Sequence, residues 1–370
     1  MVNYEGLIRH LATINDGPFA LLSQQALPTD GILANTFPDR LAALFSAEHG
    51  WFGLAAPGEK TTGEIHPHWR IPVHSLYGET RSPTPEMFEG IKRVVIDLQD
   101  VGVRCYTYLA TIKNMLEAAA KAKLPVTVLD RPQPLGGLLD GPMRELAYSS
   151  FVAPVNIPLC HGMTPGEYSQ YIVNEESLDI DLTVIRMLDW NHHSRDPWPN
   201  FAPPSPGIRS WDSAAIYPAT VFTEAYLAVD CDRAGPLSFR VLGAPWLDSA
   251  TLIDDLAEAL PACGMGLRPY RYRPSAGRYQ GKALDGILLS VDAPDAFYPV
   301  TAGTLVLAAL VNRHRDDISV DARPEWFDKL FGTATVRTTI EQGTDSLSSI
   351  FQEWINAQDE YLARKVNLYA

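Results

Sequence analysis

The stretch LAALFSAEHG, residues 41–50, joins a short apolar run to a polar turn that ends in glycine. A short apolar run of this kind predicts a strand buried on both faces, as in a parallel sheet. Two further runs have the same form: VVI at 94–96 leads into Asp97, and VTVL at 126–129 leads into Asp130. Because ligands of open α/β sheets bind beyond the carboxyl ends of the strands, these three strands predict a polar site at that edge.

The first half of the chain alternates strand and helix signals. A strand is expected at residues 19–22, another at 93–98, and a helix at 108–123 has its apolar residues on one face. Strands separated by helices favour right-handed βαβ units and a parallel sheet. The fold class predicted here is therefore α/β, with a Rossmann-like parallel-sheet domain at the start of the chain.

The signals change in the second half of the chain. Beyond Gly141 the alternation weakens, and the loop at 190–212, rich in Pro, Trp and His, is the expected boundary. We expect a Rossmann-like domain at residues 1–200 and a smaller α+β domain at residues 201–370. Further expected elements are strands at 156–159, 182–188, 270–273 and 286–291 and helices at 249–260, 302–315 and 347–363.

Composition limits the classes of partner. The 370 residues carry a formal charge of −14, which disfavours nucleic acid and anionic membranes as general partners. The four cysteines are dispersed, with no CxxC pair, as in a protein of a reducing compartment. The first ten residues, MVNYEGLIRH, lack the pattern of a signal peptide, so a cytoplasmic location is expected, with export left open.

Several motifs that would announce a cofactor are missing from the sequence. There is no G-x-G-x-x-G after the first strand, no P-loop with correct spacing, no H-E-x-x-H and no G-x-S-x-G. His66 and His68 are close in sequence, but they lie on an irregular stretch with one nearby carboxylate, Glu64. We therefore expect neither a nucleotide cofactor nor a metal.

Glu48 and His49 occupy the turn after the strand at 41–45. A carboxylate at a strand end, followed by Trp51 and Phe52, can serve as a general acid in a partly apolar pocket. The alternative interpretation is a solvated loop glutamate.

A second group of polar residues falls within the 12 residues 97–108, which begin at the end of the strand expected at 93–98. Carboxylates, an amide, a guanidinium and phenols supply the donors and acceptors that a sugar needs. The alternative is a structural network in which Asp97 or Asp100 pairs with Arg104, and Asp130-Arg131 is similarly open to an internal salt bridge. The group comprises Asp97, Gln99, Asp100, Arg104, Tyr106 and Tyr108.

The segment HGMTPGE, residues 161–167, combines two signals. Thr164, Pro165 and Glu167 form a capping box, so Glu167 is expected to start a helix rather than to catalyse. His161 precedes the box and is a candidate for the pocket.

Through these motifs the chain resembles the exo-β-N-acetylmuramidases of the NamZ type, a family long known only as a domain of unknown function. The resemblance runs from about Leu44 to Tyr369 and covers most of the chain. The matching stretches are LFSAEHGWFG, PVHSLYG, VVIDLQDVGVRCYTYL, VTVLDRPQPLGG, DGP, IPLCHGMTPGEYS, PPSPG, YPATV, GAPW and YLARKVNLY.

The resemblance implies an exo-acting glycoside hydrolase that releases terminal N-acetylmuramic acid from the non-reducing end of peptidoglycan fragments. It also implies an active-site cleft between the two domains and Glu48 as the favoured catalytic carboxylate. The catalytic candidates are then Glu48, Asp100 and Tyr106. The substrate-binding candidates are His49, Asp97, Gln99, Arg104, Tyr108, Asp130, Arg131, His161 and Glu224.

Some roles and alternatives stay open at this point. The second catalytic group could be Asp100, Asp97, Glu224 or the N-acetyl group of the substrate. Arg104 or Arg131 is expected to bind the lactyl carboxylate. The sequence departs from the family pattern at Cys105 and around Glu224, so a glycosidase for another amino sugar is an alternative, as is a non-catalytic muropeptide-binding protein on the same scaffold.

Overall fold

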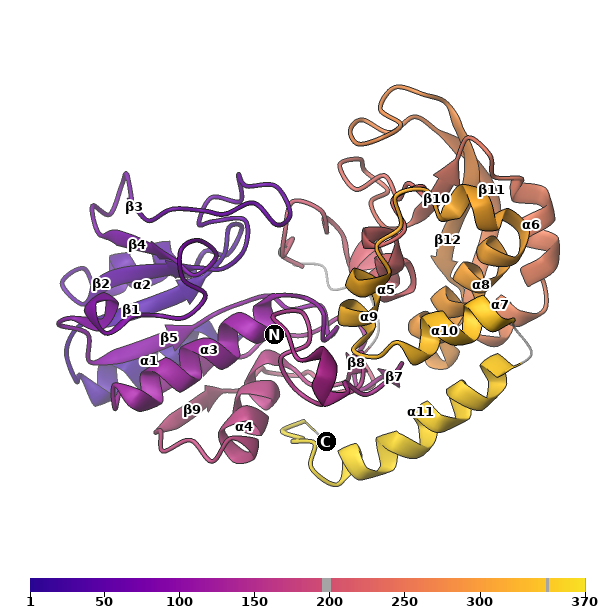
Figure 1. Ribbon diagram of the computed structural model, residues 1–370. Helices are drawn as coiled ribbons and strands as arrows, with labels where there is room; N and C mark the ends of the chain where they lie inside the picture. The colour runs from indigo at the N-terminus through magenta and orange to yellow at the C-terminus, as the bar shows by residue number, and fades with distance from the viewer. Residues whose placement is uncertain (195–200, 344–345, 370) are drawn as a thin grey trace.

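The computed structural model describes residues 1–194, 201–343 and 346–369. Two lobes lie next to each other in Figure 1, one built on a seven-stranded sheet and the other on a three-stranded sheet. The predicted α/β class, with a large and mostly parallel sheet followed by a smaller domain, is confirmed. In the part of the chain that the structure describes, no helix combines the length and apolar character needed to cross a bilayer.

The large sheet has the strand order β3-β4-β2-β1-β5-β6-β9. Its central strand β1 (Phe19–Ser23) pairs in parallel with β2 (Leu41–Ser46) on one side and with β5 (Arg93–Ile96) on the other. The chain therefore builds outward from β1 in both directions, and the crevice at this switch point lies beyond the carboxyl ends of the strands. The other strands are β3 (Glu64–Ile65), β4 (Pro72–Ser75), β6 (Val126–Leu129) and β9 (Leu182–Ile185).

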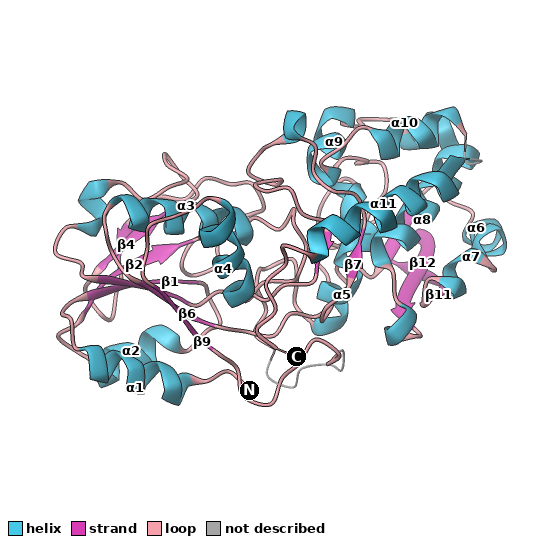
Figure 2. Ribbon diagram, turned by 90° about the horizontal axis from the view of Figure 1, so that it is seen from below, coloured by secondary structure: helices cyan, strands magenta, loops and turns pink. Residues whose placement is uncertain are grey.

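Helices cover both faces of this sheet, which is why its central strands are buried along their whole length and mostly apolar. Figure 2 shows α1 (Tyr4–Ile14) and α2 (Thr29–Thr36) on one face and α3 (Tyr108–Lys121) and α4 (Pro165–Glu175) on the other. The strands expected around 19–22, 41–45, 93–98, 126–129 and 182–188 and the helix expected at 108–123 are confirmed, with ends shifted by up to three residues.

One expected strand is wrong. Residues 156–159 are irregular, and the extended segment follows them as β8 (Cys160–His161), which pairs with β7 (Leu139–Asp140). An apolar stretch alone does not distinguish a strand from a buried loop, because the pairing partner is far away in sequence. The stretch around His66 and His68, expected to be irregular, is flanked by β3 and β4 at the sheet edge.

The second lobe is an antiparallel sheet with helices packed against it. Its strand order is β10 (Val241–Ala244), β12 (Leu284–Val291), β11 (Met265–Tyr272), and α5 (Trp211–Thr220) packs between β12 and α8 (Pro299–Ile318). The strands expected at 270–273 and 286–291 and the helices expected at 302–315 and 347–363 are confirmed with shifted ends. The helix expected at 249–260 is interrupted at residues 257–258 and forms two helices. Part of the expected boundary loop, residues 195–200, lies outside the described residues. The remaining helices are α6 (Ser249–Leu256), α7 (Ala259–Ala262), α9 (Pro324–Phe331), α10 (Thr335–Gln342) and α11 (Leu347–Leu362).

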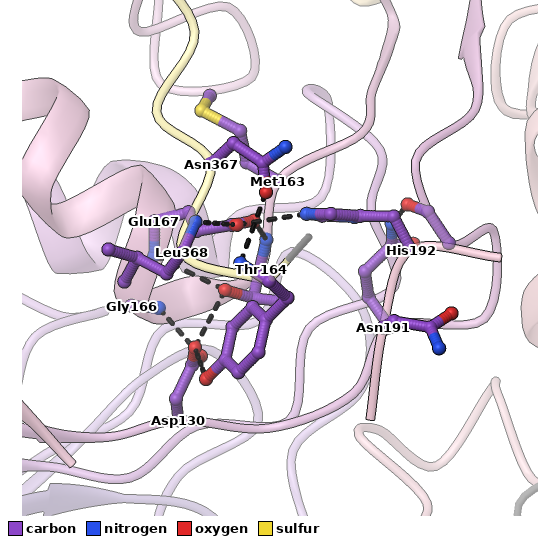
Figure 3. A network of polar contacts seen from close by, with 12 residues as sticks. Asp130, Met163, Thr164, Gly166, Glu167, Asn191, His192, Asn367 and Leu368 are labelled. Atoms are coloured by element: carbon purple, nitrogen blue, oxygen red, sulfur yellow. Dashed lines mark hydrogen bonds and ion pairs between the residues drawn. The ribbon is translucent and has the colours of Figure 1, made fainter. Parts of the chain in front are cut away.

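The end of the chain returns to the first lobe. Helix α11 runs back beneath the molecule in Figure 1, and the residues after it pack against the start of α4. Figure 3 shows Leu368 beside Glu167, to which the Leu368 amide donates at 2.7 Å. The Tyr369 hydroxyl donates to Asp130 at 2.6 Å. Glu167 also completes the predicted capping box with Thr164, so its expected role as a helix-start residue is confirmed.

Arg104 joins the two lobes from inside. Its fully buried guanidinium donates hydrogen bonds to four backbone carbonyls. Gly332, the C-cap residue of α9, packs directly against this group, because a Cβ at that position would lie 2.6 Å from Nη2 of Arg104. Burial lowers the pKa of Arg104 to about 10, which leaves the group charged at neutral pH. The acceptors are Pro142 (2.9 Å) and Ile157 (2.6 Å) in the first half and Leu330 (3.4 Å) and Phe331 (2.5 Å) in the second.

We expect Arg104→Ala to lower the free energy of unfolding by at least about 3 kcal/mol, because it leaves buried carbonyls without donors. Urea unfolding followed by tryptophan fluorescence measures the change. The matched control is Arg271→Ala, whose side chain is 72% exposed in its ion pair with Asp285 and which should change stability by less than about 0.5 kcal/mol. Equal effects of the two variants would contradict a structural role for Arg104.

Candidate active site

A cavity of about 690 Å³ opens between the two lobes. This volume is in the range of small-molecule sites. The first lobe contributes the turn after β2 and the residues that lead into α3. The second lobe contributes the loop before α5 and the segment after it. The polar lining includes Glu48, His49, Tyr77, Tyr106, Thr107, Ser205, Arg209, Thr223, Glu224, Asp230, Arg233 and Arg323.

Glu48 lies in the turn beyond β2, half-buried in the cavity wall. One carboxylate oxygen accepts a hydrogen bond from the Gly58 amide at 2.7 Å, and the other contacts the Thr107 hydroxyl at 2.6 Å. Two partners on separate segments thus fix the orientation of the carboxylate. Because an amide can only donate while a hydroxyl can donate or accept, the oxygen beside Thr107 is the one that can carry a proton.

His49 is held in a left-handed backbone conformation, with φ 74°, which turns the chain sharply after Glu48. Its ring is buried, and Nδ1 lies 2.9 Å from the Ala55 carbonyl oxygen. A carbonyl can only accept, so Nδ1 carries the hydrogen and Nε2 is left as the other polar atom of this cavity-lining ring.

Tyr106 presents a buried phenol to the cavity. Its hydroxyl oxygen is buried close to Ser205 and Tyr108, and the residue is only 8% exposed. The rings of Tyr108 and Tyr217 contact it edge-on at 4.8 and 6.0 Å between centroids and fix its position. The Tyr106 ring therefore forms part of the cavity wall, and its hydroxyl oxygen is covered by neighbouring groups.

Glu224 brings a second carboxylate to the cavity from the other lobe, at the end of the short helix η3 (Val221–Glu224). Its Oε1 atom is 3.2 Å from Nη2 of Arg233, whose guanidinium stacks over Phe239. Burial raises the pKa of Glu224, the charge of Glu48 adds to this rise, and Arg233 opposes it. The two glutamates therefore interact across the cavity.

The third acidic residue of the lining, Asp230, is already engaged. Its Oδ1 atom accepts hydrogen bonds from the Asp232 amide and from the Tyr272 hydroxyl, both at 2.8 Å. Three carboxylates thus line the cavity: Asp230 holds a loop, while Glu48 and Glu224 come from different lobes.

Four of the sequence-derived candidates bind the protein itself. Asp97 forms a bidentate ion pair with Arg131, whose Nη2 atom is 2.9 Å from Oδ2 of Asp97, and both side chains are buried. Asp130 accepts from Thr164 and from the Gly166 amide, each at 2.8 Å. The fourth is Gln99, whose amide nitrogen donates to the carbonyls of Asp100 (3.0 Å) and Pro132 (2.7 Å).

Arg104 and Tyr108 also lie away from the cavity lining. Arg104 is occupied by backbone carbonyls, and the Tyr108 hydroxyl donates to the Pro204 carbonyl at 2.5 Å. Tyr108 thereby anchors the PPSPG loop that lines the cavity. The structure thus places neither Arg104 nor Arg131, the residues expected to bind a lactyl carboxylate, where they can reach a ligand in this cavity.

Asp100 and His161 form a buried pair behind the cavity. Their nearest polar atoms are 3.9 Å apart, and Oδ1 of Asp100 and Nε2 of His161 have no partner among the described residues. Burial raises the pKa of Asp100 to about 7 and lowers the pKa of His161 to about 3. Both side chains therefore favour their neutral forms, and neither lines the cavity.

Several cavity residues were not singled out from the sequence, notably Thr107, Tyr77, Arg233 and Phe239. Thr107 lies in the stretch VVIDLQDVGVRCYTYL, and its hydroxyl is the one local signal there of a partner for a carboxylate. Arg233 gave no comparable signal, because it meets Glu224 only after the second lobe has folded. Within the described ranges, no three His, Cys, Asp or Glu side chains gather as a metal site.

Comparison with known proteins gives a consistent result. The profile described as "Exo-beta-N-acetylmuramidase NamZ, N-terminal" matches residues 20–212, and the corresponding C-terminal profile matches residues 215–369. The "Peptidoglycan beta-N-acetylmuramidase NamZ" of Bacillus subtilis (strain 168) is 36% identical over 335 residues, which are 88% of this chain and 80% of that protein.

Two solved structures share the fold. A DUF1343 family protein from Bacteroides fragilis NCTC 9343 superposes with a TM-score of 0.86 at 26% identity, over 98% of this chain and 97% of the other. A second protein of that family and organism gives a TM-score of 0.75 at 24% identity, over 98% and 96% of the two chains.

The raised pKa of Asp100 makes the free energy of unfolding depend on pH. A buried acid whose pKa is raised from 3.8 to about 7 contributes stability below pH 4 that is lost as the pH rises through 7, because ionisation is easier in the unfolded chain. Asn at this position cannot ionise. We therefore expect Asp100→Asn to gain about 2 kcal/mol relative to the wild type between pH 5 and pH 8.

Urea midpoints of both proteins at the two pH values test this expectation. Asp285→Asn is the control, since that side chain is 60% exposed and its effect should be the same at pH 5 and pH 8. A difference between wild type and Asp100→Asn that does not change with pH would contradict the assignment.

Proposed function

The chain belongs to the exo-β-N-acetylmuramidase NamZ family, and we propose that it is a glycoside hydrolase that releases terminal N-acetylmuramic acid from the non-reducing end of peptidoglycan fragments. The observation that carries the proposal for the site is the meeting of Glu48, Glu224 and Tyr106 in one sugar-sized cavity. Most glycoside hydrolases place a pair of carboxyl groups on either side of the bond that breaks.

In the proposed reaction Glu48 is the general acid. Its proton, on the oxygen beside Thr107, passes to the glycosidic oxygen as the bond between that oxygen and the anomeric carbon breaks. The Thr107 hydroxyl can accept from the protonated acid and donate to the carboxylate that remains. The Gly58 amide holds the other oxygen in both states.

Glu224 is the second carboxylate of the proposal. Facing the oxocarbenium-like centre, it would act either as a nucleophile or as the base that activates water. Arg233 supports its ionised form against the effect of burial. Tyr106 would form the wall against which the sugar packs, and Nε2 of His49 would supply a polar contact.

The competing assignment exchanges the roles of Glu48 and Glu224. Burial favours a protonated Glu224, and both oxygens of Glu48 have hydrogen-bond donors within reach. In that arrangement Glu224 would protonate the leaving group and Glu48 would stabilise the cationic centre.

The burial of the cysteines bears on the compartment in which the proposed reaction takes place. The substrates would be peptidoglycan-derived disaccharides or muropeptides, without nucleic acid or membrane partners. All four cysteines, Cys105, Cys160, Cys231 and Cys263, are buried and free, which suits a reducing compartment. We therefore propose that the reaction takes place in the cytoplasm, on recycled cell-wall fragments.

We expect Glu48→Gln to lower kcat on a MurNAc-GlcNAc disaccharide by about 10³-fold, with a much smaller loss on 4-nitrophenyl β-N-acetylmuramide. A general acid matters most when the leaving group is a poor one, and 4-nitrophenolate leaves readily without protonation. The measurement is initial rates on both substrates. Glu59→Gln, in the same loop but outside the cavity lining, is the control and should retain wild-type rates. Wild-type rates for Glu48→Gln on the disaccharide would refute its role.

Glu224→Gln should instead lose about 10²-fold or more in kcat on both substrates alike, because the second carboxylate acts on the sugar rather than on the leaving group. The same two rate measurements, repeated for this variant, complete the test. If the leaving-group dependence appears in Glu224→Gln and not in Glu48→Gln, the two roles are exchanged. If Glu224→Gln turns over at the wild-type rate, the N-acetyl group of the substrate takes the second role.

A further inference from the structure

Among the residues that the structure describes, three arginines line the cavity, and two of them have partners. Arg233 pairs with Glu224 and stacks on Phe239. Arg209 donates from Nε to the Pro206 carbonyl at 2.7 Å and lowers the pKa of Asp232 through its charge, against the effect of burial. These two guanidinium groups therefore hold the walls of the cavity.

Arg323 differs from the other two. It lines the cavity and is exposed, and within the described part of the chain no hydrogen bond or ion pair engages its side chain. A guanidinium offers five donors in a planar fork that matches a carboxylate. An unengaged group of this kind in the lining of a cavity is suited to a ligand with a negative charge.

The backbone at Arg323 is firmly placed beside the second glutamate. Its amide donates to the Ala225 carbonyl at 2.8 Å, one residue after Glu224, and a β-bridge joins Ala322 to Tyr226. These contacts tie the start of α9 to the segment that carries Glu224. The Arg323 side chain therefore starts from a fixed point close to the reaction centre.

Trp326 adds an apolar surface to the same part of the cavity lining. It lies in the first turn of α9, three positions after Arg323, which is the N-cap residue of that helix, and both residues line the cavity. Trp326 is partly buried against the core of the protein, which fixes its position. A cation beside an aromatic ring fits a ligand substituent that has both a carboxylate and a methyl group.

The lactyl ether of N-acetylmuramic acid is such a substituent, and N-acetylglucosamine lacks it. We propose that Arg323 and Trp326 form the subsite for this lactyl group, with the guanidinium on the carboxylate and the indole against the methyl group. This inference rests on the proposed function, and it names the residues that let the site distinguish the two amino sugars. It replaces Arg104 and Arg131, which are buried in structural contacts.

The test compares Arg323→Met with the wild type in two measurements. Calorimetry with free N-acetylmuramic acid should show a dissociation constant about 10- to 100-fold higher for the variant, the usual effect of losing a charge-assisted hydrogen bond. The ratio of kcat/KM for 4-nitrophenyl β-N-acetylmuramide to that for the β-N-acetylglucosaminide should fall by the same factor. The wild type should bind the lactyl methyl ester about as weakly as the variant binds the free acid.

Lys329→Met is the matched control, since it removes one positive charge from the last turn of the same helix and lies outside the cavity lining. It should leave both measurements unchanged. An unchanged affinity of Arg323→Met for N-acetylmuramic acid, or an equal loss on both glycosides, overturns the subsite. Binding that depends on Arg323 without any hydrolysis supports the subsite and refutes the proposed function, whereas hydrolysis that is independent of Arg323 does the reverse. A wild type that neither binds nor hydrolyses refutes both.

Discussion

The buried guanidinium of Arg104 is the interaction on which the rest of the structure depends. A charge with no exposure to water needs hydrogen-bond partners. Here Nη1 of the guanidinium donates to carbonyls of the first half of the chain and Nη2 donates to carbonyls of the second half. The same turn carries Tyr106 and Thr107 into the cavity. One hydrogen-bonded side chain thus fixes the separation of the two lobes and the position of two groups of the proposed site.

The carboxyl edge of the sheet divides its charges between structure and chemistry. Asp97 and Asp130 are enclosed by donors from distant segments, and the last residues of the chain complete the shell around Asp130. These contacts join the strand ends to the termini rather than to a ligand. The carboxylates left facing the cavity, Glu48 and Glu224, come from opposite lobes, so the proposed chemistry depends on how the lobes meet.

Much of the fold could be predicted because its signals are local. The apolar runs of β2, β5 and β6 announce buried strands, and the capping box at Thr164 marks the start of α4 from residue types alone. The strand expected at 156–159 was wrong because strand formation needs a partner, and the partner β7 pairs with the two residues that follow. The site was predicted only in part: residue type identified groups able to bind a sugar, but not which of them would be consumed by contacts within the protein.

The sequence by itself determined the α/β class, the strand ends that bear polar groups, and Glu48 with its neighbouring histidine at one of those ends. Only the tertiary structure decided that Arg131 neutralises Asp97, that Arg104 binds carbonyls of the other lobe, and that Glu224 and Arg323 lie in the cavity with Glu48. The physical reason is the range of the forces involved. Backbone conformation and burial patterns depend on near neighbours in sequence, whereas the pairing of a charge depends on which distant segment folding brings within about 4 Å of it.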